Sequence, residues 1–266
     1  MHIIVCVKQV PETTSVEVDE NGVLIRDGVD SKLNPYDLYA LETAMRLREE
    51  LGGEVTVVTM GPPQARAVIQ EAYMMGADRG YVFSDRKFAG ADVLATAYTL
   101  SQGIRALGAP DLIICGKQTT DGDTAQVGPA IAEYLGLPHV AWVTAIEAVN
   151  KQSITVTMDM ADSEETVRMP FPCLLTVEKG IYQPRLPSFR RKLATADREI
   201  PMLCFADFKD QDENRYGLSG SPTQVERIFN PEGNLEKEIW DGEGKELAGR
   251  IFAKLRELKF VQGGER

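Results

Sequence analysis

The chain has few of the residues that build metal or redox centres. Its 266 residues include two histidines and four cysteines, and no two cysteines form a Cys-x-x-Cys pair. A zinc site needs three or four such ligands, usually at short spacing. The sequence therefore predicts no metal site. Cys6, Cys115 and Cys173 lie in or beside apolar runs, which favours buried thiols over redox chemistry.

Long apolar runs and an excess of positive charge are also missing. Apolar runs span only a few residues, which predicts no transmembrane helix. The formal net charge is −11, whereas a nucleic-acid-binding surface is normally basic. The N-terminus lacks the basic and long apolar regions of a secretory signal. We expect a cytoplasmic protein with reduced thiols, which neither spans a membrane nor binds nucleic acid.

Two common nucleotide-binding motifs, the Walker loop and GxGxxG after the first strand, are absent. What is present is an alternation of patterns. Apolar strands are predicted at residues 3–7, 55–58, 80–83 and 112–115, with helices between them. This order is typical of right-handed βαβ crossovers and a parallel sheet. The sequence predicts an α/β fold, doubly wound, with a mainly parallel sheet.

Local signals mark the ends of several elements. Asn21-Gly22 lies between two short apolar runs at 16–18 and 23–25, which predicts a hairpin. Asn34 is a predicted N-cap, Pro35 suits the first helical position, and Asp37 lies in the first turn near the positive end of the helix dipole.

The pattern changes after about residue 140. Alternating strands are expected at 155–158 and 166–169, and a buried strand at 174–177. After Gly180 the chain is rich in proline and basic residues, which predicts an extended arm rather than a core element. An amphipathic helix at 245–258 follows.

The loop at residues 115–128 lies between a predicted strand and a predicted helix. Its glycines allow close approach of a ligand, and its last residues offer free N–H groups at a helix start, as a phosphate site requires. Asp121 and Asp123 would repel phosphate, unless they point away or bind sugar hydroxyls. A capped turn, a calcium loop and a hydrolase using both carboxylates are alternatives, although the other calcium ligands are missing.

Other strands end where the same ligand would lie, because ligands of open α/β sheets bind beyond the carboxyl ends of the strands. Lys8, Met60 and Gly116 mark three such ends, and the helix start at Asn34 belongs to the same rim. Adenine could lie against Cys6 and Met60, although without this convergence of strand ends plain core packing would be the favoured explanation of these two residues.

Five segments together resemble the beta subunit of electron transfer flavoproteins. They are residues 5–11, 34–37, 60–62, 75–78 and 116–128, and they occur in that family's order and spacing. The resemblance implies a flavodoxin-like (adenine nucleotide hydrolase-like) domain at 1–180, completed by the strands from about 140. It also implies a partner-recognition arm and C-terminal segment at 181–266, which wraps around an alpha subunit.

The resemblance implies an adenine nucleotide at this rim, which is AMP in ordinary members and FAD in electron-bifurcating members. Residues 84–96 resemble the bifurcating type, in which Arg86, Ala89 and Gly90 would serve a larger ligand. The expected cofactor contacts are these three residues with Cys6, Asn34, Pro35, Tyr36, Asp37, Met60, Gly116, Lys117, Gln118, Thr119, Thr120, Asp121, Gly122, Asp123, Thr124, Ala125, Gln126 and Val127.

The same resemblance implies the chemistry and the partners. FAD would take a hydride from NADH and pass electrons to ferredoxin and, through a flavin of the alpha subunit, to an acyl-CoA dehydrogenase-type flavoprotein. The flavin carries the chemistry, so no catalytic side chain is expected. Phe189, Arg190 and Arg191 fall at the family's docking loop. A stand-alone nucleotide-binding protein of the universal-stress type is the alternative from another class.

Overall fold

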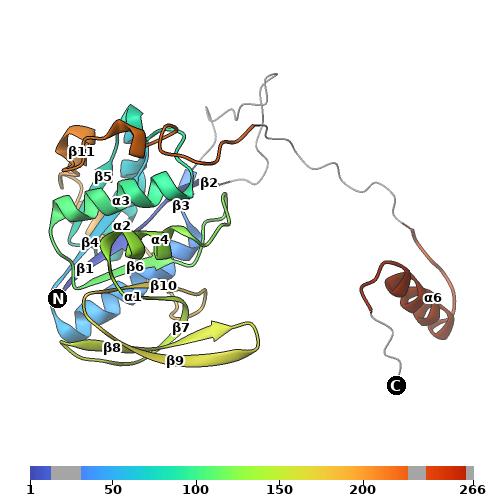
Figure 1. Ribbon diagram of the computed structural model, residues 1–266. Coiled ribbons are helices and arrows are strands. Elements are labelled where there is room, and N and C mark those ends of the chain that lie inside the picture. Colours follow the sequence, from blue (N-terminus) through green and yellow to red (C-terminus); the bar gives the residue numbers. More distant parts are fainter. Residues whose placement is uncertain (13–30, 227–237, 262–266) are drawn as a thin grey trace. The chain divides into compact units, whose positions relative to one another are not determined.

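The computed structural model describes residues 1–12, 31–226 and 238–261 (Figure 1). The chain divides into two compact units, Met1–Arg227 and Ile228–Arg266. The hairpin predicted around Asn21-Gly22 lies outside the described residues.

The first unit is built on a nine-stranded sheet in the order β11-β5-β4-β1-β6-β10-β7-β8-β9. The strands from β11 to β7 run parallel, and β8 and β9 continue the sheet antiparallel. Their bounds are β1 His2–Cys6, β4 Glu54–Met60, β5 Arg79–Phe83, β6 Leu112–Gly116, β7 His139–Val149, β8 Ser153–Met160, β9 Ser163–Pro170, β10 Cys173–Val177 and β11 Met202–Leu203. A separate antiparallel pair joins β2 (Gln9–Pro11) to β3 (Ser31–Leu33).

Helices cover both faces of the parallel strands, as predicted for a doubly wound fold. Because side chains alternate along a strand, Val5 belongs to the core cluster of α1 (Pro35–Leu51) and α2 (Arg66–Met75). Ile4 belongs to the cluster of α3 (Val93–Leu107) and α4 (Val127–Leu135). Figure 1 shows α3 and α4 in front of the sheet. Central strands buried on both faces explain why they appear in sequence as continuous apolar runs.

The segment after Gly180 packs more closely than an extended arm would. It forms α5 (Phe189–Ala194), which packs on α2, and β11, which pairs with β5 at the edge of the sheet. Phe208 then stacks on Phe88 with ring centroids 5.3 Å apart, and Tyr216 lies edge-on to Tyr98 at 5.3 Å. The compact unit therefore ends well beyond the boundary predicted at 180. The irregular aromatic spacing of this segment has no period that sequence reasoning could use.

The second unit contains α6 (Gly244–Glu257), which confirms the predicted terminal helix. Three large apolar side chains of α6 are exposed, Ile251, Phe252 and Leu255, and so is Leu258 directly after the helix. No helix in the described ranges is long and apolar enough to cross a membrane.

Candidate nucleotide-binding site

The predicted rim lies at the point where the strand order reverses. β1 stands between β4 and β6, with Cys6 in register with Val58 on one side and Cys115 on the other. The chain leaves β1 through α1 toward β4, and it returns from β5 through α3 to β6. The carboxyl ends of β1 and β6 therefore open a crevice, which is where open α/β sheets bind ligands.

Asp37 joins three parts of the chain at this crevice. Its carboxylate accepts from the backbone N–H of Lys8 at 2.7 Å and from the side-chain amide of Asn34 at 2.9 Å, and it also faces the backbone N–H of Gly116. Burial raises the pKa of Asp37 to about 7, against the opposing effect of these hydrogen bonds and of the charge of Lys8. Both carboxylate oxygens thus have hydrogen-bond partners within the protein. Asp37 therefore supports the site by holding Lys8, Asn34 and Gly116 in place.

Asn34 has a different role from the predicted N-cap. Its side chain makes no cap for α1; its amide donates to the Gln118 carbonyl at 2.9 Å, and its oxygen accepts from the Thr120 N–H at 3.2 Å. Pro35 has no N–H to cap, and the Asp37 N–H is satisfied by the Asn34 carbonyl at 2.9 Å. The side chain is therefore available to clamp the loop after β6.

Gly116 is required where β6 approaches the start of α1. A Cβ at this position would lie 2.4 Å from Asp37 Oδ1 and 2.7 Å from the Tyr36 carbonyl carbon. The glycine thus allows a close approach between two parts of the protein. Two groups of residues predicted to contact the cofactor, 34–37 and 116–120, therefore lie together, as the sequence pattern indicated.

The rest of the loop is held by local contacts and contains two unusual backbone conformations. The Gln118 side-chain amide donates to Asp123, and the Asp123 N–H donates to the Thr119 carbonyl at 3.0 Å. Asp123 and Ala125 both have φ of 54°, a region that costs energy for residues other than glycine. Strain of this kind is concentrated at ligand sites and switch regions.

The start of α4 offers hydrogen-bond donors. No side chain in the described part of the chain caps this helix, whereas Asp92 caps α3 and Ser188 caps α5. The first N–H groups of a helix have no partner within the helix, and together with its dipole they attract anions. Predicted contacts from Thr124 to Val127 lie at or just before this helix start. The donor set therefore fits the phosphates of a nucleotide.

The apolar wall of the crevice contains two neighbouring thiols. Cys6 and Cys115 are in register on adjacent strands, 9% and 6% exposed, on the same face as the partly buried Met60. A hydrogen bond with Cys6 and burial raise the pKa of the Cys115 thiol. A buried thiol with a raised pKa is a poor nucleophile, so Cys115 is suited to packing rather than to redox chemistry.

The segment proposed for a larger ligand is exposed and contacts a later part of the chain. Arg86 is exposed in a 3-10 turn, η2 (Arg86–Phe88), but the Ala89 carbonyl accepts from the Leu218 N–H at 3.0 Å. A Cβ at Gly90 would lie 3.3 Å from the Leu218 Cβ. The side chain of Asp92 caps α3 by accepting from the Ala95 N–H. The later part of the chain thus contacts the segment through Leu218, although Ala89 and Gly90 themselves stay exposed.

The predicted docking loop contains a residue that sequence reasoning missed. Leu186 is 87% exposed, compared with 71% for Phe189, and Arg190 is also exposed. The guanidinium of Arg191 instead donates to the Met75 carbonyl at 2.6 Å, at the end of α2. Proline on both sides of the Arg185-Leu186 pair was the signal that could have identified this rigid apolar tip.

Arg185 anchors that tip to α1. Its guanidinium donates to Glu42 at 2.7 Å and to Glu49 at 2.7 Å, and the exposed fraction of Glu42 is 3%. Burial opposes ionisation of Glu42, but hydrogen bonds from Arg185 and Arg46 hold the pKa of Glu42 below its ordinary value. A forked pair of this kind fixes geometry as well as charge.

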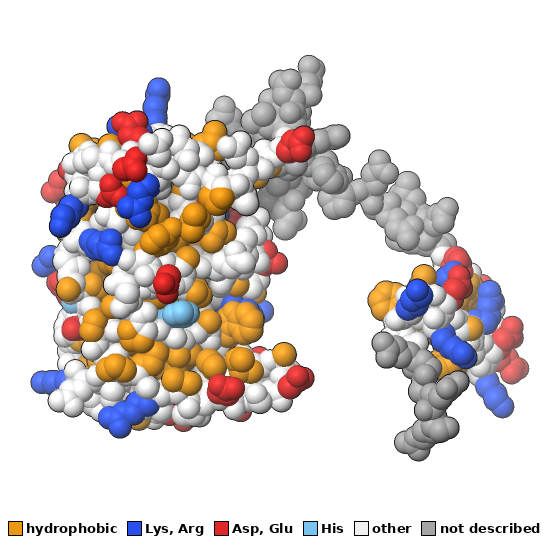
Figure 2. Space-filling view, in the orientation of Figure 1, with side chains coloured by type: hydrophobic (Ala, Val, Ile, Leu, Met, Phe, Trp, Pro, Cys, Tyr) orange, Lys and Arg blue, Asp and Glu red, His pale blue; other side chains and the backbone are white. Residues whose placement is uncertain are grey.

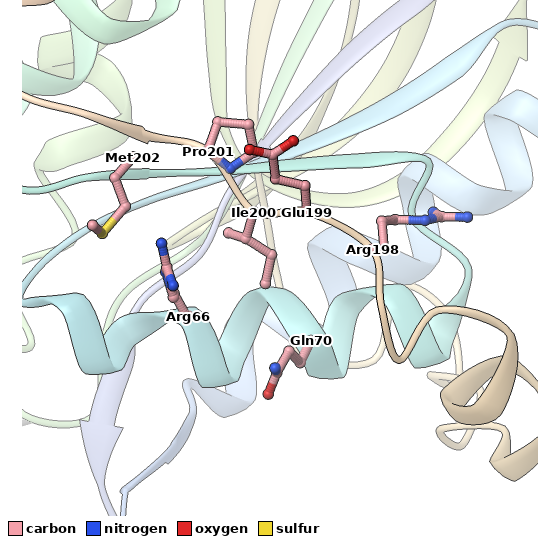
Figure 3. A pocket seen from close by; sticks show the side chains of 7 residues that line it. All are labelled: Arg66, Gln70, Arg198, Glu199, Ile200, Pro201 and Met202. Atoms are coloured by element: carbon pink, nitrogen blue, oxygen red, sulfur yellow. The ribbon is translucent and has the colours of Figure 1, made fainter.

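A pocket of about 440 Å³ lies elsewhere, between α2 and the chain entering β11 (Figure 3). No predicted cofactor contact lines it. Its lining residues are Arg66, Gln70, Arg198, Glu199, Ile200, Pro201 and Met202. Within the described ranges, no group of His, Cys, Asp or Glu side chains could hold a metal ion.

The topology is that of a doubly wound α/β protein whose polar loops meet at the switch point of the sheet. Residues 21–202 match the family described as the electron transfer flavoprotein domain. The electron transfer flavoprotein subunit beta of Clostridium acetobutylicum is 42% identical over 262 residues, 98% of this chain and 100% of that protein. The chain therefore belongs to the electron transfer flavoprotein family, among its beta subunits, and membership implies an alpha subunit as partner.

Two further relatives have different names. The caffeyl-CoA reductase-Etf complex subunit CarD of Acetobacterium woodii is 43% identical over 264 residues, 98% of this chain and 100% of that protein. Protein FixA of Azorhizobium caulinodans is 42% identical over 244 residues, 89% of this chain and 87% of that protein. The universal-stress-type alternative is excluded, because the chain matches an electron transfer flavoprotein subunit beta along 98% of its length.

Proposed function

We propose that this chain is the beta subunit of a bifurcating electron transfer flavoprotein and binds FAD at the β1–β6 crevice. The observation that carries the proposal is the uncapped start of α4 beside a glycine-bearing loop at the switch point. Similarity to a subunit of a caffeyl-CoA reductase complex supports a partner that acts on acyl-CoA substrates. A cytoplasmic location is part of the proposal.

In this proposal the side chains position the cofactor. The N–H groups at the start of α4 hold its phosphates, and Cys6 and Met60 form the apolar wall. Asn34 and Asp37 keep the loop after β6 in place. When bound, FAD would accept a hydride from NADH and pass electrons toward ferredoxin and toward the flavin of the alpha subunit. The contribution of the protein is then binding, orientation and electrostatics.

The exposed apolar surface supports a partner subunit. In Figure 2 hydrophobic side chains gather over α4 and the β7–β9 end of the sheet, where Trp142 and Met160 are each 39% exposed. Exposed apolar patches commonly mark protein interfaces. The exposed apolar side chains of α6 suit the same role in the wrapping segment.

A hydrolase using Asp121 and Asp123 as a pair is disfavoured by their contacts. Asp121 pairs with Lys8, whereas Asp123 accepts from the Gln118 side chain. Although partial burial favours the neutral form, hydrogen bonds and charge from Lys8 hold the pKa of Asp121 below its ordinary value. A carboxylate pair for acid–base work needs one pKa raised by a shared environment.

A cofactor count tests the proposal. The chain is co-expressed with its alpha subunit, and FAD and AMP released from the purified heterodimer are quantified. We expect two FAD per heterodimer and bleaching of the flavin spectrum by NADH. One FAD with one AMP would leave the conventional, non-bifurcating carrier. Absence of any adenine nucleotide would contradict both.

Truncation of the exposed leucine is expected to weaken docking. In Leu186→Ala, kcat/KM for reduction of an acyl-CoA dehydrogenase-type partner should fall roughly 30-fold, since an anchoring residue contributes about 2 kcal/mol or more. The cofactor content should stay unchanged. Leu193→Ala, on α5 and 66% exposed, is the matched control. If Phe189→Ala lowers the rate and Leu186→Ala does not, Phe189 is the anchor.

A further inference from the structure

The side chain of Lys8 and the loop after β6 are joined by one ion pair. Lys8 Nζ lies 2.8 Å and 2.7 Å from the two carboxylate oxygens of Asp121. The two side chains are 44% and 33% exposed. Ion pairs this accessible to water are weak, because solvent screens the charges and long side chains lose entropy. The pair can therefore exchange partners at little cost.

The backbone of Lys8 is fixed while its side chain is not. Its N–H donates to Asp37 at 2.7 Å, and its carbonyl accepts from the Asn34 N–H at 2.9 Å. These bonds hold the Lys8 Cα directly after β1, beside the crevice at the switch point. The flexible four-carbon side chain then carries the ammonium group to this crevice, where the group can turn from one acceptor to another.

The side chain of Asp121 takes no part in the contacts by which Asn34 clamps the loop. Asn34 clamps the loop at Gln118 and Thr120, and Asp121 comes after the last clamped residue. Asp123 and Ala125, farther along, have φ of 54°. A strained segment can change conformation when a ligand replaces one of its contacts.

A second lysine at these strand ends, Lys117, also forms an ion pair. Lys117 follows β6, and its Nζ lies 2.7 Å from Glu178, whose side chain is 23% exposed. Lys117 also lies over the Trp142 ring, 5.2 Å from its centroid. Since that pair is the less exposed of the two, a ligand anion would take Lys8 more readily than Lys117.

We propose that Lys8 binds a phosphate group of the nucleotide and that Asp121 competes with the phosphate for Lys8 in the ligand-free protein. The inference rests on the proposed nucleotide site. A phosphate brings more negative charge than a carboxylate and has additional donors at the start of α4, so it displaces Asp121. Asp121 then turns toward solvent, and this removes the repulsion that made a carboxylate in this loop difficult to explain.

Binding of AMP and of adenosine to single variants of the heterodimer tests the exchange. After removal of dissociable nucleotide, Lys8→Gln should weaken AMP binding about tenfold and leave adenosine binding unchanged. Asp121→Asn should tighten AMP binding several-fold, because the competing charge is gone. The double variant should bind AMP as weakly as Lys8→Gln does, since without Lys8 there is nothing to compete for.

Two charge-matched variants serve as controls. Lys151→Gln in the β7–β8 turn and Asp159→Asn in β8 change the net charge equally at exposed positions, and neither should alter AMP affinity. Equal weakening of AMP and adenosine by Lys8→Gln would assign Lys8 a structural role and overturn the inference. Weaker AMP binding by Asp121→Asn would do the same. Wild-type protein that binds no adenine nucleotide would instead overturn the proposed function.

Discussion

Gly116→Ala is expected to destabilise the protein and abolish retention of the nucleotide. The new Cβ would lie 2.4 Å from Asp37 Oδ1 and 2.7 Å from the Tyr36 carbonyl carbon. Asp37 cannot move aside, because Lys8 and Asn34 hold its carboxylate. β6 would therefore shift away from α1, and overpacking of this kind costs about 1–3 kcal/mol.

Unfolding in urea and a cofactor count measure this effect. We expect a loss of about 2 kcal/mol in the free energy of unfolding, which lowers Tm by roughly 4–8 °C for a domain of this size. Gly122→Ala is the control for folding, since its Cβ would meet only Thr119 Oγ1, at 3.3 Å. Its free energy of unfolding should change by less than about 0.5 kcal/mol. A Gly116→Ala protein with wild-type stability would contradict the close approach of β6 and α1.

Asp37→Asn should make the stability of the protein less dependent on pH. Burial raises the pKa of Asp37 to about 7 from its ordinary 3.8, so the folded protein holds this proton more tightly than the unfolded chain does. The resulting contribution to stability is fully present below pH 3.8 and is lost as the pH rises to 7. Each unit of pKa shift corresponds to about 1.4 kcal/mol, so the total is about 4 kcal/mol.

Comparing the pH dependence of stability between the wild type and Asp37→Asn isolates the contribution of the Asp37 carboxyl group. Asn has no proton to lose, and its poorer bond with the Lys8 N–H should lower stability by a constant amount at every pH. The wild type should thus lose free energy of unfolding relative to Asp37→Asn between pH 5 and 7, with little further change above pH 8. Asp159→Asn, at an exposed position, should parallel the wild type. Parallel curves for wild type and Asp37→Asn would contradict the buried, protonatable carboxyl group.

Much of the fold and the place of the site could be predicted because the signals are local. Continuous apolar runs predicted β1, β4, β5 and β6, and the order of strands and helices predicted a parallel sheet. Because carboxyl ends of parallel strands share one edge, residues 34–37 and 116–120 could be expected together. The structure brings these two segments into contact through Asn34.

The roles of individual polar side chains could not be predicted in the same way. Asn34 has the sequence context of a cap but clamps a loop 84 positions away, and Arg191 is bound to the end of α2 instead of lying free for docking. A side chain that can satisfy a local group or a distant one shows no preference in the sequence. Which partner it takes depends on tertiary approach distances.

By itself, the sequence determined the α/β class, the doubly wound sheet and the family, because apolar periodicity and motif order are encoded along the chain. Tertiary structure alone decided that Asp37 is buried, that Lys8 faces Asp121, that Leu186 is exposed and that residues 205–216 complete a core. These features depend on which surfaces meet after folding. Burial and the distance between charges, which set a pKa or an ion pair, exist only once segments far apart in sequence are packed together.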